Sequence, residues 1–309
     1  MSKTLYSSNI MNQFDVIIIG GSYAGLSAAM ALGRSLKKTL IIDAGKPCNR
    51  QTPHSHNFLT RDGETPKAIS AIALEQVMKY ESVSFKKGTV VSGSRTNSGY
   101  EIVTSNKDVF STKKLILATG IKDEMPDIPG FAESWGISVI HCPYCHGYEF
   151  KTKKTGIFAN GDQAFHLAGL VSNLTNELTI LTNGDHEFTD EQIAKLEQHS
   201  ISIVESKLLE IVHQKGAMLR IVFKDGNALD LDAMYAHVPF THHIDLSSKL
   251  GYKYTEQGYI EIDAFQKTTV PNIFACGDNS SRMRSVANAV STGNFAGAMA
   301  NMELTNENF

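Results

Sequence analysis

The hydrophobic positions near the start of the chain alternate between strand and helix patterns. A continuous apolar run over 14–19 ends in a glycine-rich turn over 20–25, and a helical pattern follows. A second apolar run over 39–42 then ends at Asp43. This order is typical of a dinucleotide-binding unit, because the turn lets backbone amides approach a pyrophosphate and the acid accepts hydrogen bonds from a ribose. Ser22 replaces the second glycine of the GxGxxG pattern, which is a small departure.

The same order of patterns returns in the second half of the chain. A predicted strand over 154–159 precedes a turn over 160–162, a helix over 163–173 and a strand over 178–181. No arginine cluster follows that strand, although a 2′-phosphate normally requires one. The sequence therefore does not support NADPH recognition in its usual form, and it leaves open whether NADH or no nicotinamide binds. Ala159 replaces the first glycine, so the positions that remain for a nicotinamide nucleotide are Gly161, Asp162 and Ala164.

Two such units predict an α/β fold with two dinucleotide-binding, Rossmann-like domains, and 309 residues are enough for both. The segment 123–130 contains two prolines and a glycine, which favours a junction between domains. Further patterns predict strands near 84–91, 99–104, 115–118, 201–204, 208–213, 217–223 and 271–275, and a final helix over 284–302 rich in small residues that can pack closely.

Composition narrows the classes of partner. Hydrophobic residues make up 42% of the chain, and the net charge is −3, so there is no basic stripe of the kind that nucleic acid requires. The apolar run that follows the polar start of the chain is too short for a secretory signal or a membrane span. The sequence therefore predicts a cytoplasmic protein without nucleic acid or membrane partners. Four cysteines are too few for a secreted disulfide scaffold, so a close pair indicates catalysis or metal binding.

The segment from Cys142 to His146 reads CPYCH and admits three chemistries, which are a reversible disulfide, covalent haem and a metal site. Haem attachment belongs to exported cytochromes, and the two dinucleotide-binding units give the wrong context for it. For zinc, His141 would have to join Cys142, Cys145 and His146, and one backbone turn can hardly direct all four inward. We therefore expect no metal and a working dithiol.

The order of these motifs resembles that of the small thioredoxin reductases, which are homodimeric pyridine nucleotide-disulfide oxidoreductases. The similar motifs are the first turn, Ala118–Gly120, the CxxC pair, the second turn and Phe274–Asp278. The resemblance covers nearly the whole chain. It implies bound FAD, a homodimer, and a discontinuous FAD domain of residues 1–120 and 248–309. A NAD(P)-binding-like domain over 121–247, carrying the CxxC pair, is then inserted into it.

The same resemblance implies a set of FAD-binding residues. The first-turn residues would hold the pyrophosphate, Asp43 the adenosine ribose and Asp278 a ribityl hydroxyl. Asn57 matches an asparagine close to the flavin, and two residues near the start of the last helix would present backbone amides to the flavin ring. The full set is Gly20, Gly21, Ser22, Ala24, Gly25, Asp43, Asn57, Thr119, Gly120, Gly277, Asp278, Ser285 and Val286.

Roles for the CxxC residues also follow from the resemblance. Cys145 would face the flavin as a charge-transfer thiolate, and Cys142 would exchange with the substrate. In standard thioredoxin reductases an acid follows the second cysteine, and His146 stands there in this chain. Because an imidazole can exchange protons near neutral pH, His146 is the candidate acid–base group, with Glu149 as the alternative.

The replacement by His146 bears on function. The run from Cys145 to Glu149, CHGYE, resembles relatives of the gliotoxin and holomycin type, which oxidise small dithiols and return the electrons to oxygen. We expect an FAD-dependent thiol–disulfide oxidoreductase, acting on a thioredoxin-like protein or a small dithiol or disulfide. An oxygen-dependent dithiol oxidase and a non-enzymatic flavin redox sensor are the alternatives. NADPH, NADH and a ferredoxin-type donor all stay open as electron sources.

Overall fold

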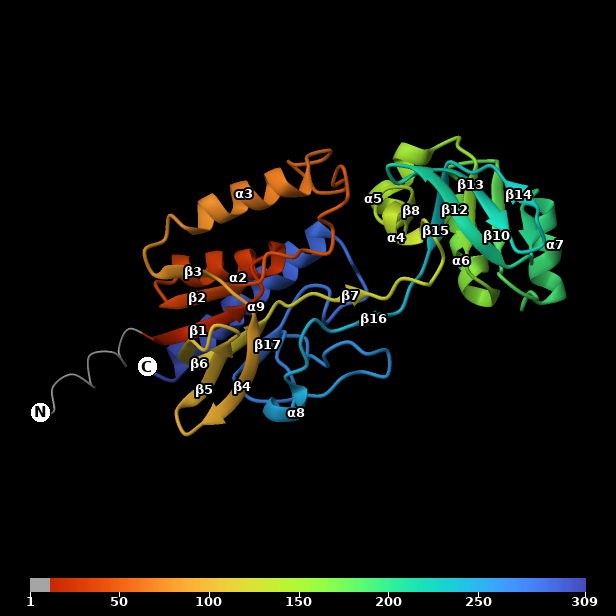
Figure 1. The fold of residues 1–309 in the computed structure, drawn as a ribbon. Helices are drawn as coiled ribbons and strands as arrows, with labels where there is room; N and C mark the ends of the chain where they lie inside the picture. The colour runs from red at the N-terminus through yellow and green to blue at the C-terminus, as the bar shows by residue number, and fades with distance from the viewer. Residues whose placement is uncertain (1–11) are drawn as a thin grey trace, which may run out of the picture. The chain divides into compact units, whose positions relative to one another are not determined.

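The chain crosses four times between two units, whose elements are labelled in Figure 1. The computed structural model describes residues 12–309. The last two crossings carry the short strands β7 (Lys122–Asp123) and β16 (Phe240–Thr241), which pair with each other. The first unit extends to Arg50 and also contains Lys67–Lys122 and Thr241–Phe309, and the second unit contains Gln51–Pro66 and Asp123–Phe240.

These boundaries differ from the sequence-based division in one respect that matters for function. The division by resemblance kept residues 51–66 with the FAD domain, whereas the structure groups them with the unit that carries the CxxC pair. The polar, turn-rich composition of this segment gave no sign of which unit it would join. The assignment of the two units to FAD and to a nicotinamide nucleotide stays a prediction.

A seven-stranded sheet forms the centre of the first unit. Its parallel strands follow continuous apolar runs, because both faces of such strands are covered. The order is β3-β2-β1-β6-β5-β4, and β17 pairs with the second half of β6. The strands are β1 (Gln13–Ile19), β2 (Thr39–Asp43), β3 (Val83–Lys87), β4 (Val90–Thr96), β5 (Gly99–Thr104), β6 (Val109–Leu117) and β17 (Ile273–Ala275).

One predicted strand is wrong. The alternating run over 84–91 is divided between β3, which lies parallel to β2, and β4, which lies antiparallel to β5. The break falls at Gly88, whose N–H donates to the carbonyl oxygen of Asp43 at 2.8 Å. The chain therefore leaves the parallel sheet there, and only β4 and β5 form the predicted antiparallel pair.

The helices of the first unit are α2 (Tyr23–Arg34), α3 (Pro66–Val77), α8 (Ser247–Leu250) and α9 (Val286–Asn306). The small residues of α9 allow it to pack closely on α2, as the sequence predicted. A Cβ atom at Gly293 would overlap the carbonyl oxygen of Ala24, and one at Gly297 would meet the backbone of Ala28. This close packing sets α9 against the helix that follows the first glycine turn.

The second unit contains a five-stranded parallel sheet in the order β11-β10-β9-β15-β8 and a three-stranded antiparallel sheet, β12-β13-β14. Its strands are β8 (Val139–Ile140), β9 (Thr155–Phe158), β10 (Leu178–Leu181), β11 (Ser202–Val204), β12 (Leu208–Gln214), β13 (Ala217–Phe223), β14 (Ala228–Leu229) and β15 (Ala233–Ala236). Its helices are α4 (Phe131–Ser134), α5 (Pro143–His146), the 3₁₀ turn η1 (Gly147–Phe150), α6 (Gly161–Val171) and α7 (Asp190–Gln198).

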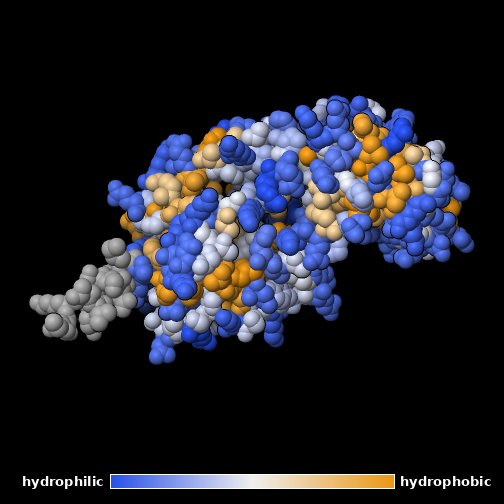
Figure 2. Space-filling model, viewed as in Figure 1, coloured by the Kyte–Doolittle hydropathy of each residue, from blue (hydrophilic) through white to orange (hydrophobic). Residues whose placement is uncertain are grey.

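The surface mixes polar residues with smaller apolar areas. Figure 2 shows apolar residues gathered over the β12–β14 sheet, where the side chains of Leu209 and Leu219 are about half exposed. Within residues 12–309, no helix combines the length and the apolar character needed to cross a membrane. The cytoplasmic location stays a prediction.

Candidate functional site

The first glycine turn lies between β1 and α2, where its geometry requires glycine. Gly20 has a φ of +105°, which L side chains rarely adopt, and a Cβ atom there would overlap the carbonyl oxygen of Ala118. A Cβ atom at Gly25 would in turn overlap the carbonyl oxygen of Gly20. The turn therefore brings bare backbone to the start of α2, as a pyrophosphate requires.

The start of α2 is open to an anion. Ser22 is the N-cap residue with an extended backbone, its side chain makes no capping hydrogen bond, and the first turn contains no acid. Asp43, at the end of β2, accepts hydrogen bonds from the N–H groups of Gly21 and Gly45, each at 2.8 Å. The carboxylate is thus fixed beside the turn, where a ribose hydroxyl would need it. Ala24 and Gly25 lie buried in the first turn of α2.

Three loops of the first unit follow the carboxyl ends of neighbouring parallel strands. Leu117, in β6, pairs with Ile19 in β1 and with Ala275 in β17, so the loops after these strands share one edge of the sheet. Ligands bind at this edge in open α/β sheets. The loops contain the predicted residues Gly20–Ser22, Thr119, Gly120, Gly277 and Asp278.

Asn279 is a residue at this edge that the sequence analysis did not single out. Its side chain is fully buried, and its amide nitrogen donates to the carbonyl oxygen of Leu117 at 2.9 Å and to the hydroxyl of Thr119 at 3.1 Å. Its amide oxygen is buried and accepts no hydrogen bond from the residues that the structure describes. Together with the glycine turn, this unpaired acceptor fits the edge to a large polar ligand such as FAD.

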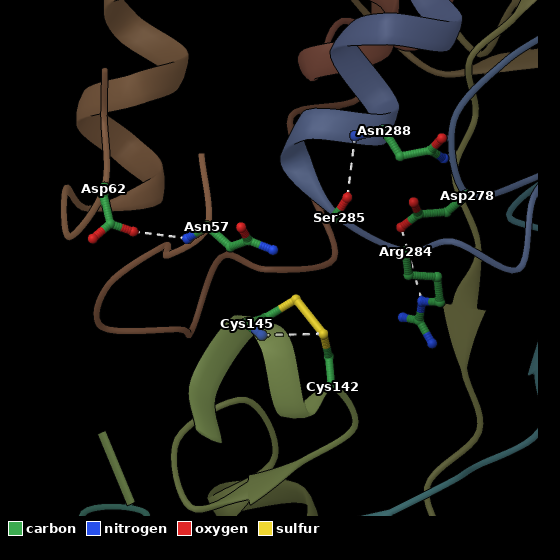
Figure 3. Close-up of a disulfide and its surroundings, with 8 residues drawn as sticks. All are labelled: Asn57, Asp62, Cys142, Cys145, Asp278, Arg284, Ser285 and Asn288. Carbon is green, nitrogen blue, oxygen red and sulfur yellow. Dashed lines mark hydrogen bonds and ion pairs between the residues drawn. A yellow bond between two sulfur atoms is a disulfide. The ribbon is translucent and has the colours of Figure 1, made fainter. Parts of the chain in front are cut away.

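Asp278 lies among residues that the prediction treated separately. Its carboxylate is 3.9 Å from the Arg284 guanidinium and 3.7 Å from the sulfur of Cys48, for which the sequence suggested no partner (Figure 3 labels Asp278 and Arg284). Ser285 is the N-cap of α9 and accepts a hydrogen bond from the Asn288 N–H at 3.1 Å, so α9 begins at Val286. Asp278 thus contacts Arg284, the residue that directly precedes Ser285 and Val286 at the start of α9.

The second turn, at the start of α6, is occupied by the chain itself. Asn160 is the N-cap, and its side-chain oxygen accepts from the N–H groups of Gly161 at 2.9 Å and Glu187 at 3.0 Å. Its amide donates to the carbonyl oxygen of Asp185 at 2.9 Å. Asp162 accepts from Gln192 at 2.8 Å, and Ala164 is fully buried. The N–H groups of Gly161 and Glu187, which could bind a pyrophosphate, therefore already donate to the Asn160 side chain. The acid Asp162 in the first turn of α6 would also repel a phosphate.

The CxxC pair forms a disulfide in the second unit, with Cα atoms 5.3 Å apart. Cys142 is the N-cap of α5, Pro143 begins the helix, and the Cys145 N–H donates to the Cys142 sulfur at 3.2 Å (Figure 3). A hydrogen bond donated to a sulfur stabilises negative charge on it. Once the disulfide opens, this N–H favours a thiolate on Cys142, the form that exchanges with a disulfide.

His146 ends α5 in a partly buried position. Burial, together with the nearby charge of His56, lowers the pKa of His146 to about 4. At neutral pH the imidazole is therefore uncharged. The role of His146 as the acid–base group stays a prediction, and this shift makes it a weak base.

The segment 51–66 forms an ordered loop. Ser55 and Glu64 pair as a β-bridge, and the Asn57 N–H donates to Asp62 at 2.7 Å (Figure 3). Asn57 has a φ of +58°, a conformation that asparagine tolerates better than most residues. The proposed contact of Asn57 with the flavin stays a prediction, since its N–H serves to close this loop.

Comparison with known proteins agrees with this geometry. Residues 14–293 match the family described as pyridine nucleotide-disulphide oxidoreductase. The chain belongs to this family. It is 31% identical to a protein named thioredoxin reductase tcpT from Claviceps purpurea, over 96% of this chain and 95% of the relative.

Solved structures of similar oxidoreductases have the same fold. The putative thioredoxin reductase TrxB from Bacillus anthracis is 32% identical with a TM-score of 0.91, over 96% of this chain and all (100%) of that one. An oxidoreductase from Agrobacterium tumefaciens is 37% identical with a TM-score of 0.89, over 95% and 99% of the two chains. The predicted α/β class with Rossmann-like sheets is confirmed, and this oxidoreductase is thioredoxin-reductase-like.

Sequence reasoning missed three features of this oxidoreductase. Asn279 directly follows the predicted Gly277–Asp278 pair, but its neighbours in space could not be read from the sequence. Asn160 precedes a glycine at a helix start, which is a recognisable capping position. Tyr235 is buried, and its hydroxyl lies against Gly147 in the turn that follows α5, but no local pattern marked it. In residues 12–309 no group of histidine, cysteine and acidic side chains is arranged to hold a metal ion.

Proposed function

We propose that this oxidoreductase uses FAD to oxidise small dithiols and passes the electrons to oxygen. The enzyme class follows from the family and from the disulfide. The proposal adds that a dithiol donates the electrons and that oxygen accepts them. It depends on the difference between the turns that begin α2 and α6.

The first unit would hold the FAD. Gly20, Gly21 and the start of α2 would receive the pyrophosphate, Asp43 the ribose and Asp278 the ribityl chain. The unpaired oxygen of Asn279 adds an acceptor at the same edge. Bound FAD would supply a two-electron acceptor for the thiols.

The observation that carries the proposal is the closed turn at α6. In a nicotinamide-dependent reductase this turn must offer free N–H groups to a pyrophosphate and positive charge to a 2′-phosphate. Here the Asn160 carboxamide accepts the N–H groups of Gly161 and Glu187. The loop after β10 contains Asp185 and Glu187 and no arginine. The residues present therefore do not fit NADPH, which favours a dithiol as the electron donor.

The disulfide would take part by two exchange steps. One substrate thiol attacks Cys142, the Cys142–Cys145 bond breaks, and a mixed disulfide forms as Cys145 leaves as a thiolate. The second substrate thiol then attacks the mixed disulfide, which releases the oxidised substrate and Cys142. The substrate loses two electrons and two protons to the enzyme. With oxygen as the final oxidant, the overall reaction converts a dithiol and O₂ into a disulfide and H₂O₂.

An anaerobic titration tests the proposal. The purified holoenzyme is mixed in a stopped-flow instrument with dithiothreitol, NADPH or NADH, and the flavin absorbance is followed. We expect the dithiol to bleach the flavin absorbance within the time of one turnover and neither nucleotide to do so at a comparable rate. The flavin absorbance should recover when air is admitted. Rapid bleaching by NADPH would contradict the proposal.

A reductase of a thioredoxin-like protein is the second candidate. The name thioredoxin reductase, borne by relatives such as tcpT, favours it. The same titration separates the two, because a reductase must accept electrons from a nicotinamide nucleotide. If no donor gives steady-state turnover, a redox sensor is the better description. The homodimer expected from the resemblance stays a prediction.

A further inference from the structure

The loop 51–66 brings a histidine to the 3₁₀ turn that follows the CxxC helix. His56 Nε2 lies 3.5 Å from Glu149 Oε1, and its Nδ1 lies 3.7 Å from Asp62 Oδ1. The loop holds this position through its own bonds, since Ser55 N–H donates to Glu64 at 2.8 Å and Gly63 N–H donates to Ser55 at 2.9 Å. His56 is therefore part of the second unit, although it is distant from the cysteines in sequence.

The electrostatics also connect His56 with the redox motif. The charge of His56 lowers the pKa of His146, which directly follows Cys145. The titratable groups that face His56 are Glu149 from η1, His146 from α5, and Asp62 and His54 from its own loop. The side chain of Glu149 is 37% exposed and that of His56 is 21% exposed. The pair His56–Glu149 thus has both access to solvent and a position beside the motif.

A buried tyrosine lies against the same turn but is unsuited to take a proton. Tyr235 is 1% exposed, and a Cβ atom at Gly147 would lie 2.8 Å from its hydroxyl. Burial raises the pKa of Tyr235, and the Glu149 carboxylate raises it further. The hydroxyl therefore stays protonated. Since its lowered pKa makes His146 a weak base, the remaining basic groups are Glu149, which follows Cys145 by four residues, and His56, which contacts Glu149.

We infer that His56 and Glu149 act as one acid–base pair for the Cys142–Cys145 disulfide. The inference deepens the proposed function, on which it rests. When the substrate S–H bond breaks, the proton passes to the pair as the new bond to Cys142 forms and Cys145 leaves as a thiolate. When the second thiol attacks, Cys142 leaves and takes up a proton from the pair. The second substrate proton remains on the pair until it passes to solvent.

The test uses the half-reaction, which needs neither oxygen nor turnover. Wild-type holoenzyme, His56→Gln and Glu149→Gln are mixed anaerobically with excess dithiothreitol between pH 6 and pH 10. Samples are quenched and alkylated, and mass spectrometry of the peptide with both cysteines gives the fraction reduced. His54→Gln is the matched control, because His54 is an exposed histidine of the same loop.

The expected result is a defect that depends on pH. At pH 6–7 the thiol arrives protonated, so each variant should be slower by on the order of 10²-fold, a typical contribution of general acid–base catalysis. At pH 10 a thiol with an ordinary pKa of about 8.5 arrives as the thiolate and needs no base, so the rates should converge with the wild type. His54→Gln should follow the wild type throughout.

Two results would overturn the inference. Variants slowed by one constant factor at every pH would show a structural role, and variants unchanged at every pH would show no role. The proposed function fails separately, if the wild type consumes no oxygen with a dithiol in air. In that case, the pH-dependent exchange would still establish the pair.

Discussion

The turns that begin α2 and α6 follow strands of the same kind, yet their backbone amides meet different groups. At α2 the N-cap Ser22 makes no side-chain hydrogen bond and the glycine backbone is bare. At α6 the N-cap Asn160 joins its helix to the loop after β10 by two hydrogen bonds, and its side chain accepts a third from the Gly161 N–H. One pattern of strand, turn and helix can therefore serve ligand binding in one unit and only packing in the other.

If the second unit takes part in catalysis only through its disulfide and binds no nucleotide, removal of the disulfide should abolish dithiol oxidation. Cys142→Ser should lower dithiol oxidation by on the order of 10³-fold or more, because the exchanging nucleophile is lost. Oxygen consumption measures this effect. Cys145→Ser should also be inactive, but its Cys142 thiolate should attack an added aromatic disulfide, release one half as a thiolate and keep the other half as a stable mixed disulfide, visible by mass spectrometry. Trapping by Cys142→Ser instead would reverse the assigned roles of the two cysteines.

A side chain added at Gly20 tests whether the bare backbone of the first turn binds FAD. Gly20→Ala should lower FAD affinity by at least about tenfold, because its φ is positive and the new methyl group would displace the Ala118 carbonyl. The ratio of flavin to protein absorbance after dialysis measures the loss. Gly169→Ala in α6 is the matched control, since a Cβ atom there has no neighbour within 4 Å. Full flavin retention by Gly20→Ala would remove the proposed pyrophosphate site.

The two N-caps give a direct comparison of stability. Asn160→Ala should lower the free energy of unfolding by about 1–2 kcal/mol, because it removes a working cap. Ser22→Ala should change it by less than about 0.5 kcal/mol, since the Ser22 side chain caps nothing. Urea denaturation followed by circular dichroism measures both. Equal losses would mean that the two turns are not as different as their hydrogen bonds indicate.

The last prediction concerns the acid response of the second unit. The pKa of His146 is about 4 in the folded chain against an ordinary 6.5, so between these values the unfolded chain binds a proton that the folded chain does not. Stability from this group is therefore complete above pH 6.5 and declines as the pH falls toward 4. His146→Gln should flatten the decline in urea midpoints, and the exposed His199→Gln should not. If the urea midpoint of His146→Gln fell with pH as steeply as that of the wild type, the lowered pKa of His146 would be refuted.

Several parts of this fold could be predicted because they depend on local sequence. The apolar runs over 14–19, 39–42 and 178–181 became strands with nearly those bounds, since buried parallel strands need unbroken hydrophobic residues. Helix α7 was missed because it is polar overall and has Leu196 as its one buried residue, so no apolar run marks it. Its start nevertheless carries a capping box between Thr189 and Gln192, a signal that was available.

The candidate site divides in the same way. The glycines of the first turn and the CxxC pair could be found because their chemistry depends on adjacent residues. The Asn279 hydrogen bonds and the His56–Glu149 contact could not, because they join segments that only the folded sheet and loop bring together. The closed turn at Asn160 is intermediate, since the cap was readable but its contact with Glu187 was not.

The grouping of residues 51–66 with the CxxC unit has a practical consequence for domain grafting. A transplant of the continuous stretch 123–240 into another flavoprotein would carry the disulfide, His146 and Glu149 but would leave His56 behind. The redox module of this enzyme is a composite of two stretches, one of which interrupts the other unit between Arg50 and Lys67. Exchanging domains at β7 and β16 alone would therefore separate Glu149 and the disulfide from His56.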